Sequence, residues 1–264
     1  LSSETCALDT VGAEFVRDVL PGEVVTITSK GIESDTSLCQ KKNARCIFEY
    51  IYFARPDSKI DGMGVYESRI NAGRILAKTH PVDADLVVGV PESGNPAALG
   101  FSLESGIPYG NAFIKNNYVG RTFIKPKQAQ RESSVKVKLN VLKEAVAGKR
   151  VVMIDDSIVR GTTSARIVSL LKNSGAKEVH VKISAPPFLH PCYFGTDIPS
   201  EEQLIAHNRT VDQICELIGA DSLSYLRMER LYEMAEGLPI CTACFNGEYP
   251  IDPPKEDIRG DFER

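Results

Sequence analysis

The segment VVMIDDSIVRGTTS, residues 151–164, constrains the fold of this 264-residue chain more than any other part of the sequence. It joins a short apolar run to two adjacent aspartates and then to a polar stretch rich in glycine and hydroxyl residues. A continuous apolar run of this length predicts a strand that is buried on both faces, as in a parallel sheet. The helical spacing that follows predicts a turn leading directly into a helix.

The same alternation of strand and helix is found on both sides of this segment. The run DLVVGVP (85–91) predicts a buried strand, and NPAALGFSLESG (95–106) predicts a helix that begins near a proline and ends at a glycine. A helix over 66–79 precedes them, and the strand EVHVKISAP (178–186) follows. Alternating strands and helices predict an α/β fold with a mostly parallel, twisted sheet and helices on both faces.

Other elements are expected in less regular parts of the chain. YGNAFI (109–114) predicts a strand, and LNVLKEAV (139–146) predicts a helix. After Pro187 the spacing predicts a mostly helical part, in SEEQLIAH, TVDQICELIG and SYLRMERLYEMAEG.

The stretch 115–138 differs from its surroundings because it carries seven Lys or Arg residues and little periodicity. It is longer than an ordinary connection, and such loops are either functional lids or solvated surface segments. Its position after a predicted strand favours a lid that closes over a bound substrate.

The composition excludes several classes of protein. A net charge of -4 offers no strongly basic surface, so no nucleic-acid partner is expected. No apolar run is long enough to span a bilayer, and no signal peptide opens the sequence, so no membrane association is expected. Seven cysteines in a chain of this size do not suggest a disulfide framework, which favours a reducing, cytoplasmic location.

The two aspartates of the first segment are expected to lie at a ligand site. Asp155 and Asp156 end a predicted parallel strand, and open α/β sheets bind ligands outside the carboxyl ends of their strands. Two adjacent carboxylates are costly there unless something positive or hydrogen-bonding faces them. A pair of sugar hydroxyls or a hydrated Mg²⁺ meets that need.

The residues after the aspartates are suited to a phosphate. The hydroxyls of Ser157, Thr162, Thr163 and Ser164, together with Gly161 and the N–H groups of a helix start, form a cradle for a dianion. A ribose 5-phosphate fits both halves of the segment. The alternative is a strand, a turn and a capped helix with no ligand, but the complete pattern favours the sugar phosphate.

VVMIDDSIVRGTTS resembles the ribose-phosphate signature of the type I phosphoribosyltransferases. FEYIYFARPDS, VPESGNPAALGF, KNNYVGRTFIKP and LIAHNRTVDQI resemble segments of the glutamine phosphoribosylpyrophosphate amidotransferases (amidophosphoribosyltransferases), and the resemblance covers nearly all of 1–245. It implies the type I phosphoribosyltransferase fold and the first committed step of purine synthesis. In that step phosphoribosyl pyrophosphate (PRPP) loses pyrophosphate while ammonia, derived from glutamine, attacks C1 to give 5-phosphoribosylamine.

The resemblance also implies a division of the chain. Residues 1–45 resemble the last strands of an Ntn-type glutaminase domain and its linker, and 46–264 resemble the phosphoribosyltransferase domain with a helical tail that contains a CxxC pair. The family's glutaminase domain begins with a cysteine nucleophile. Cys6 is not N-terminal, so it is not assigned that role.

The resemblance assigns roles to individual residues. It implies a magnesium site at Ser93, Asp155 and Asp156, and pyrophosphate contacts from Lys115 and Lys138, which bracket the basic loop. The turn PESGN would wrap the pyrophosphate, although by itself it is equally compatible with an ordinary β–α turn. The expected catalytic residues are Asp155, Asp156, Lys115 and, in the lid, Arg121. The other expected substrate contacts are Glu92, Gly94, Asn95, Ser157, Arg160, Gly161, Thr162, Thr163 and Ser164.

The sequence CTAC (241–244) is a CxxC pair, which suggests a metal site, redox chemistry or simply two buried thiols. Cys46 and Cys192 bring the number of thiols to four, which suits tetrahedral zinc or an iron–sulfur cluster, and spacing does not choose between them. The resemblance implies a [4Fe–4S] cluster on Cys46, Cys192, Cys241 and Cys244, because one branch of the family carries one.

Two other functions are compatible with the same fold. A PRPP-sensing transcription regulator should carry a DNA-binding module or a basic face, and a salvage purine phosphoribosyltransferase would not need the CxxC tail. The hypothesis of an amidotransferase is therefore preferred. The resemblance further implies Mg²⁺ as a cofactor, AMP and GMP as feedback inhibitors, and a homotetramer.

Overall fold

A four-stranded parallel sheet forms the centre of the computed structural model, which describes residues 1–39, 43–115, 139–196 and 200–253. The strands are β6 (Leu86–Gly89), β9 (Arg150–Asp155), β10 (Glu178–Ile183) and β11 (Ser222–Tyr225), in the order β11-β10-β9-β6. The predicted α/β fold with a parallel sheet is confirmed.

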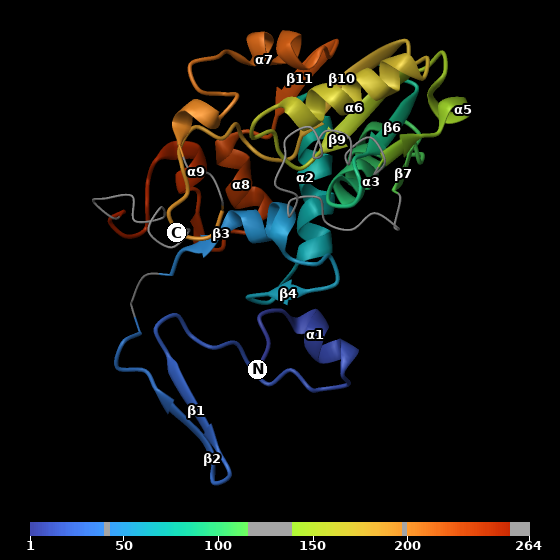
Figure 1. Cartoon of the computed structure of the whole chain (residues 1–264). Helices are drawn as coiled ribbons and strands as arrows, with labels where there is room; N and C mark the ends of the chain where they lie inside the picture. The colour runs from blue at the N-terminus through green and yellow to red at the C-terminus, as the bar shows by residue number, and fades with distance from the viewer. Residues whose placement is uncertain (40–42, 116–138, 197–199, 254–264) are drawn as a thin grey trace, which may run out of the picture.

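Strand β9 lies between β10 and β6, and Val151 to Ile154 have no exposed surface. Its run of apolar residues is explained by helices that cover the sheet on both faces. Helices α2 (Val65–Thr79) and α3 (Gly94–Ser105) lie on one face, while α6 (Thr162–Asn173) and α7 (Val211–Ile218) lie on the other (Figure 1). The last residue of β9, Asp155, therefore lies at the carboxyl edge of the sheet and directly follows a fully packed core.

Helices α2 and α3 pack backbone against backbone through two glycines. A Cβ atom on Gly73 would lie 1.8 Å from the carbonyl oxygen of Ala97, and a Cβ atom on Gly100 would lie 2.0 Å from the carbonyl oxygen of Ile70. No side chain fits at either position. The close contact holds α3, and the turn that precedes it, in a fixed position over the sheet.

Strands β7 (Phe113–Lys115) and β8 (Leu139–Val141) form an antiparallel pair outside the central sheet. The predicted strand over 109–114 is thus shorter and later than expected, although Tyr109 forms a single bridge to Val87. The predicted helix over 139–146 is wrong in its first half, because pairing with β7 makes these residues extended. Only the short helix α5 (Lys143–Val146) remains.

The part of the chain after Pro187 contains less helix than predicted. The expected helix at 224–237 begins late, because Ser222–Tyr225 forms β11 beside β10 and only α8 (Met228–Met234) is helical. The expected helix at 200–207 reduces to the 3₁₀ turn η3 (Glu201–Gln203). Helix α7 is confirmed, and Thr210 and Gln213 form a capping box at its start.

The N-terminal part consists of α1 (Thr5–Thr10) and a hairpin of β1 (Val24–Thr28) and β2 (Gly31–Asp35), which extends away from the sheet (Figure 1). Glu4 joins this part to the rest, because its Oε2 accepts hydrogen bonds of 2.8 Å from the Arg55 N–H and the Ser58 hydroxyl. The remaining short elements are β3 (Arg45–Cys46), η1 (Glu49–Phe53), β4 (Lys59–Ile60), β5 (Met63–Gly64), β12 (Ile240–Cys241) and α9 (Ala243–Asn246). Among the described residues, no helix has the length and hydropathy needed to cross a membrane.

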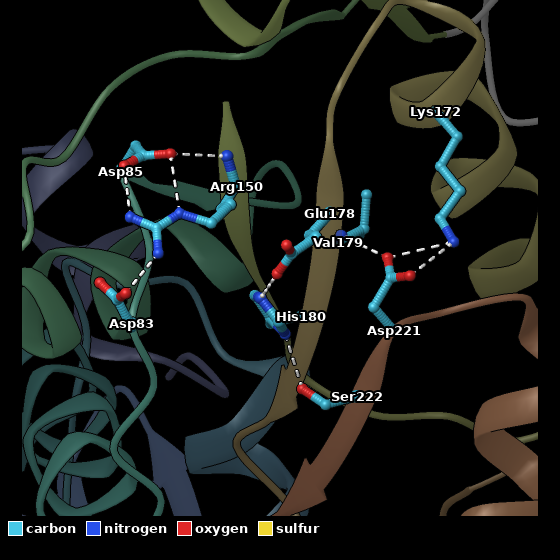
Figure 2. Close-up of polar contacts among 9 residues, drawn as sticks. All are labelled: Asp83, Asp85, Arg150, Lys172, Glu178, Val179, His180, Asp221 and Ser222. Atoms are coloured by element: carbon cyan, nitrogen blue, oxygen red, sulfur yellow. Dashed lines mark hydrogen bonds and ion pairs between the residues drawn. The ribbon is translucent and has the colours of Figure 1, made fainter. Parts of the chain in front are cut away.

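Ion pairs fix the amino ends of the strands (Figure 2). The Arg150 guanidinium at the start of β9 contacts Asp83 and Asp85, and its NH2 group lies 2.7 Å from Asp85 Oδ1. Asp221 accepts a 2.7 Å hydrogen bond from the Val179 N–H and pairs with Lys172. These charges are compensated locally, and the arginine holds the pKa of Asp85 well below its usual range.

We expect Gly73→Ala to destabilise the protein by about 1–3 kcal/mol, because the added methyl group would push α2 away from α3. Urea denaturation would measure the change. Gly64→Ala, at the start of the same helix, is the matched control: its Cβ atom meets open space, and its backbone suits alanine, so stability should stay level or rise. Equal effects at the two positions would contradict the close-packing argument.

We expect Arg150→Met to lower stability at pH 7 more than at pH 3. The folded-state pKa of Asp85 is depressed, so its ion pair stabilises the protein above the ordinary carboxyl pKa of 3.8 and loses that effect as pH falls through the folded-state value. Urea denaturation of wild type and variant over this pH range would show the two curves converging. Lys149→Met, a neighbouring charge removal, should show no such convergence.

Candidate active site

The two aspartates at the end of β9 are nearly buried, with exposed fractions of 7% for Asp155 and 8% for Asp156. Two hydroxyls donate to Asp156: Ser93 Oγ lies 2.5 Å from its Oδ2, and Ser157 Oγ lies 2.5 Å from its Oδ1. The Asp156 N–H donates to Asp155 Oδ1 at 2.9 Å. The structure therefore brings together Ser93, Asp155 and Asp156, which the sequence analysis grouped as a magnesium site.

Burial raises the pKa of both carboxyl groups. For Asp155 the neighbouring charge of Asp156 raises the pKa further. For Asp156 the rise due to burial is opposed by the hydroxyls of Ser157 and Ser93 and by the positive charge of Arg69. The pair as it stands favours holding a proton, and a cation or a donor-rich ligand facing it would allow both groups to ionise.

The turn between β6 and α3 brings Ser93 to the acidic pair. The Gly94 N–H donates to the Val90 carbonyl oxygen at 3.0 Å, and a Cβ atom on Gly94 would lie 2.5 Å from the carbonyl oxygen of Ile154. Glycine is therefore required here by the close approach of the turn to the end of β9. A Cβ atom on Gly89 would lie 2.6 Å from the side-chain oxygen of Asn95, so the turn also packs closely against the end of β6.

Lys115 ends β7 and reaches the same turn, where its Nζ lies 3.0 Å from Glu92 Oε1. Both side chains are exposed. The structure thus brings these two predicted pyrophosphate contacts together. Lys138, the other lysine predicted to contact pyrophosphate, and Arg121, the predicted catalytic residue of the lid, lie outside the described residues.

The loop from Ser157 to Gly161 leads into α6. Gly161 has a left-handed backbone (φ 78°) and precedes Thr162, the first residue of the helix. In the described structure, no side chain caps this helix end, and Thr162 and Thr163 are exposed while Ser164 is buried. The first N–H groups of α6 are therefore available to an anion.

A cavity of about 230 Å³ adjoins the site between the β6–α3 turn, Lys115 and helix α6. Tyr52 and Arg166 contribute to its wall, and the sequence analysis named neither. Tyr52 lies in η1, which Arg69 holds through hydrogen bonds of 2.8 Å to the carbonyl oxygens of Tyr50 and Ala54. The aromatic run FEYIYF was the signal that could have pointed to Tyr52.

Four cysteines line a second cavity, of about 750 Å³, away from the acidic pair: Cys46, Cys192, Cys241 and Cys244. Cys46 and Cys241 are register partners in the short parallel pair of β3 and β12. Cys244 follows in α9, and Cys192 lies in the loop after β10. The fold thus brings together thiols from three distant parts of the chain.

The thiols influence one another electrostatically. Burial, followed by the charges of Cys241 and Cys192, raises the pKa of Cys46 to about 11, and burial also raises the pKa of Cys241 and of Cys244. Burial opposes ionisation of Cys192 too, but backbone N–H groups outweigh it and lower its pKa. Within the described ranges, no three His, Cys, Asp or Glu side chains stand ready to hold a metal ion. The four cysteines line one cavity, but their positions in this structure do not match those of metal ligands.

Comparison with known proteins agrees with this geometry. Residues 70–186, which include the acidic pair and the loop into α6, match the phosphoribosyl transferase domain family. The amidophosphoribosyltransferase of Synechococcus elongatus is 54% identical over 258 residues, covering 97% of this chain and 52% of that protein. The amidophosphoribosyltransferase of Archaeoglobus fulgidus is 51% identical over 261 residues, covering 97% and 57%. The chain spans about half the length of these curated relatives.

Two solved structures are similar over most of the chain. One, described as the allosteric regulatory enzyme of purine biosynthesis, has a TM-score of 0.88 at 50% identity and covers 96% of this chain and 56% of its own. The other is the glutamine PRPP amidotransferase of B. subtilis in complex with ADP and GMP, with a TM-score of 0.87 at 49% identity, covering 96% and 57%. The chain therefore has the type I phosphoribosyltransferase fold and carries the phosphoribosyltransferase domain of the amidophosphoribosyltransferase family.

Proposed function

We propose that the protein is an amidophosphoribosyltransferase, which joins ammonia to C1 of PRPP and releases pyrophosphate to give 5-phosphoribosylamine, the first committed step of purine synthesis. The observation that carries the proposal is the buried Asp155–Asp156 pair, which hydroxyl donors hold beside the uncapped start of α6. Identity above 50% to two curated amidophosphoribosyltransferases over 97% of the chain supports it.

Each part of PRPP has matching groups in this arrangement. The acidic pair suits the ribose hydroxyls, and the N–H groups at the start of α6 suit the 5-phosphate. The hydroxyls of Ser157, Thr162, Thr163 and Ser164 and the guanidinium of Arg160 complete the phosphate site. The pyrophosphate is assigned to Lys115 and to the turn of Glu92, Ser93, Gly94 and Asn95. Arg121 and Lys138 keep their predicted roles in the lid and at its base.

The same residues suit a magnesium ion. Ser93, Asp155 and Asp156 offer the oxygen donors that Mg²⁺ prefers, and a bound cation would offset the burial that raises the pKa of both carboxyl groups. When bound, Mg²⁺ supplies neutralisation of the pyrophosphate charge.

The reaction breaks the bond between C1 and the pyrophosphate oxygen and forms a bond between C1 and the ammonia nitrogen. Positive charge develops on the ribose between these events, and the carboxylates of Asp155 and Asp156 stabilise it. Lys115 stabilises the negative charge on the departing pyrophosphate. Ammonia supplies its own lone pair, and the ammonium group formed at C1 loses its proton to solvent water. The side chains therefore contribute positioning and electrostatics, and no general base is assigned.

We propose that residues 1–45 belong to a glutaminase domain that supplies ammonia from glutamine, with 46–264 forming the transferase domain and its tail. Exposed apolar side chains on the β1–β2 hairpin, Val24, Ile27 and Ile32, support contact with further protein. The complex of the B. subtilis relative with ADP and GMP supports regulation by purine nucleotides, with AMP and GMP as the expected inhibitors. A homotetramer is proposed on the resemblance alone.

We also propose that the protein belongs to the iron–sulfur branch of the family and binds one [4Fe–4S] cluster at Cys46, Cys192, Cys241 and Cys244. Their common cavity and the mutual electrostatic effect of their thiols support a cationic centre there. Because the thiols come from β3, the loop after β10 and the β12–α9 tail, the cluster would join three parts of the chain. Its role is structural, since the transfer reaction needs no open iron site.

Asp155→Asn and Asp156→Asn should each lower the rate of PRPP-dependent pyrophosphate release by about ten- to a hundredfold, because each loses a charged hydrogen bond at the ribose site. The assay uses ammonia, with adenine and guanine in parallel to detect a salvage enzyme. Asp212→Asn, an exposed change on α7, is the control. Full activity in both site variants would exclude the ribose-site assignment, and no turnover with any acceptor would favour a PRPP-sensing regulator.

Anaerobically purified protein should contain iron and sulfide in the amounts of one [4Fe–4S] cluster and show its visible absorption. Cys241→Ser should lose iron and lower the denaturation midpoint, because the joined segments separate. Cys39→Ser and Cys215→Ser are the matched controls and should keep both. Stoichiometric zinc without iron would refute the cluster but support a metal ion that joins the three parts of the chain. Full stability with no metal would refute both the cluster and that structural role.

A further inference from the structure

A segment distant in sequence packs on the loop that leads into α6. We call residues 203–205 the strap, and residues 159–161 the phosphate loop. The strap contacts each of the three loop residues. The Ile205 N–H donates to the Val159 carbonyl oxygen at 2.8 Å, and the Arg160 NH2 group donates to Gln203 Oε1 at 2.7 Å.

The third contact is steric. A Cβ atom on Gly161 would lie 2.2 Å from Cδ1 of Ile205 and 3.3 Å from its Cγ1. The strap therefore packs directly against the backbone of Gly161, whose left-handed φ of 78° already favours glycine. The side chain of Ile205 occupies the space that any larger residue at position 161 would need.

The strap is itself held on both sides. Leu204 is 1% exposed and Ile205 is 9% exposed, so apolar packing holds the strap against the core. Just before it, Glu201 contacts His190, with 3.0 Å between Oε1 and Nδ1. Just after it, the Arg209 NH1 group donates to the Ile205 carbonyl oxygen at 3.1 Å. Because the strap is fixed in this way, it can hold the phosphate loop in one conformation.

We propose that Ile205 and Gln203 are positioning residues, which hold the phosphate loop in the shape that binds the 5-phosphate of PRPP. The inference rests on the proposed function, because it names the substrate of the same site. Neither residue is expected to touch the substrate: Ile205 acts through the backbone at Val159 and Gly161, and Gln203 acts through the side chain of Arg160. Backbone N–H groups bind a phosphate well only when their directions are fixed in advance.

The interaction between Ile205 and Gly161 allows an atom-specific test in the complete protein. Ile205→Val removes Cδ1, the atom that a new Cβ at position 161 would meet. Gly161→Ala alone should raise the KM for PRPP by about tenfold or more, because the loop must shift. Adding Ile205→Val should recover about threefold or more of this loss. The remaining loss reflects the strain of placing alanine in the left-handed backbone conformation at position 161.

The single strap variants test each contact separately. Ile205→Val and Gln203→Ala should raise the KM for PRPP severalfold with little change in kcat, because ground-state and transition-state binding of the phosphate weaken together. Ile75→Val, a matched loss of one methylene in α2, should lower stability without changing the KM.

Competition experiments separate positioning from general loosening of the fold. Ribose 5-phosphate and pyrophosphate should each inhibit the wild-type enzyme competitively with PRPP. The strap variants should weaken inhibition by ribose 5-phosphate severalfold and leave inhibition by pyrophosphate unchanged. Equal weakening of both inhibitors, or additive effects of Gly161→Ala and Ile205→Val, would overturn the proposal.

These outcomes are distinct from failure of the proposed function. Isothermal titration of wild-type protein with PRPP and Mg²⁺ establishes whether the substrate binds at all. If wild type binds PRPP and releases pyrophosphate while the strap variants match it in every assay, only the positioning role is wrong. If wild type neither binds nor turns over PRPP, the proposed function fails, and the positioning role fails with it.

Discussion

The burial of two adjacent carboxyl groups at the end of β9 is the constraint on which the rest of the site depends. Asp155 ends a strand in which Val151 to Ile154 have no exposed surface, Asp156 follows it, and burial raises the pKa of each. The hydroxyls of Ser93 and Ser157 oppose this rise at Asp156 alone, and only in part, because a hydroxyl brings a dipole and no net charge. The fold therefore maintains a site that gains stability when positive charge or a set of hydroxyl donors arrives.

The two ends of the sheet differ in how their charges are compensated. At the amino ends, Arg150 pairs with Asp83 and Asp85, and Lys172 pairs with Asp221. At the carboxyl end, the described part of the chain forms no ion pair with either aspartate of the site, and the nearby cation Arg69 donates to backbone carbonyl oxygens instead. This asymmetry places the capacity for ligand binding at one edge of the molecule.

Close backbone contacts set the positions of the groups around the aspartates. Gly73 and Gly100 bring α2 and α3 together, and Gly94 brings the turn before α3 against Ile154. At Gly161 the close contact is with the side chain of Ile205 in the strap. Packed contacts of this kind resist small displacements, because a shift of a few tenths of an ångström already produces overlap. The hydroxyls and N–H groups that face the site thereby keep fixed directions.

Strand β9, the loop after it and α6 could be predicted from the sequence, because a strand buried on both faces requires an apolar run and a glycine and hydroxyl residues precede the helical spacing of α6. The sequence also determined the place of the acidic pair and, through resemblance, its partner Ser93. The tertiary structure alone decided β8 and β11, which become strands by pairing with β7 and β10 against a local helical spacing. It alone brought Ile205 to Gly161. It also placed in one cavity the four distant cysteines that the resemblance had grouped. Such contacts join residues far apart in the chain, and no local spacing records them.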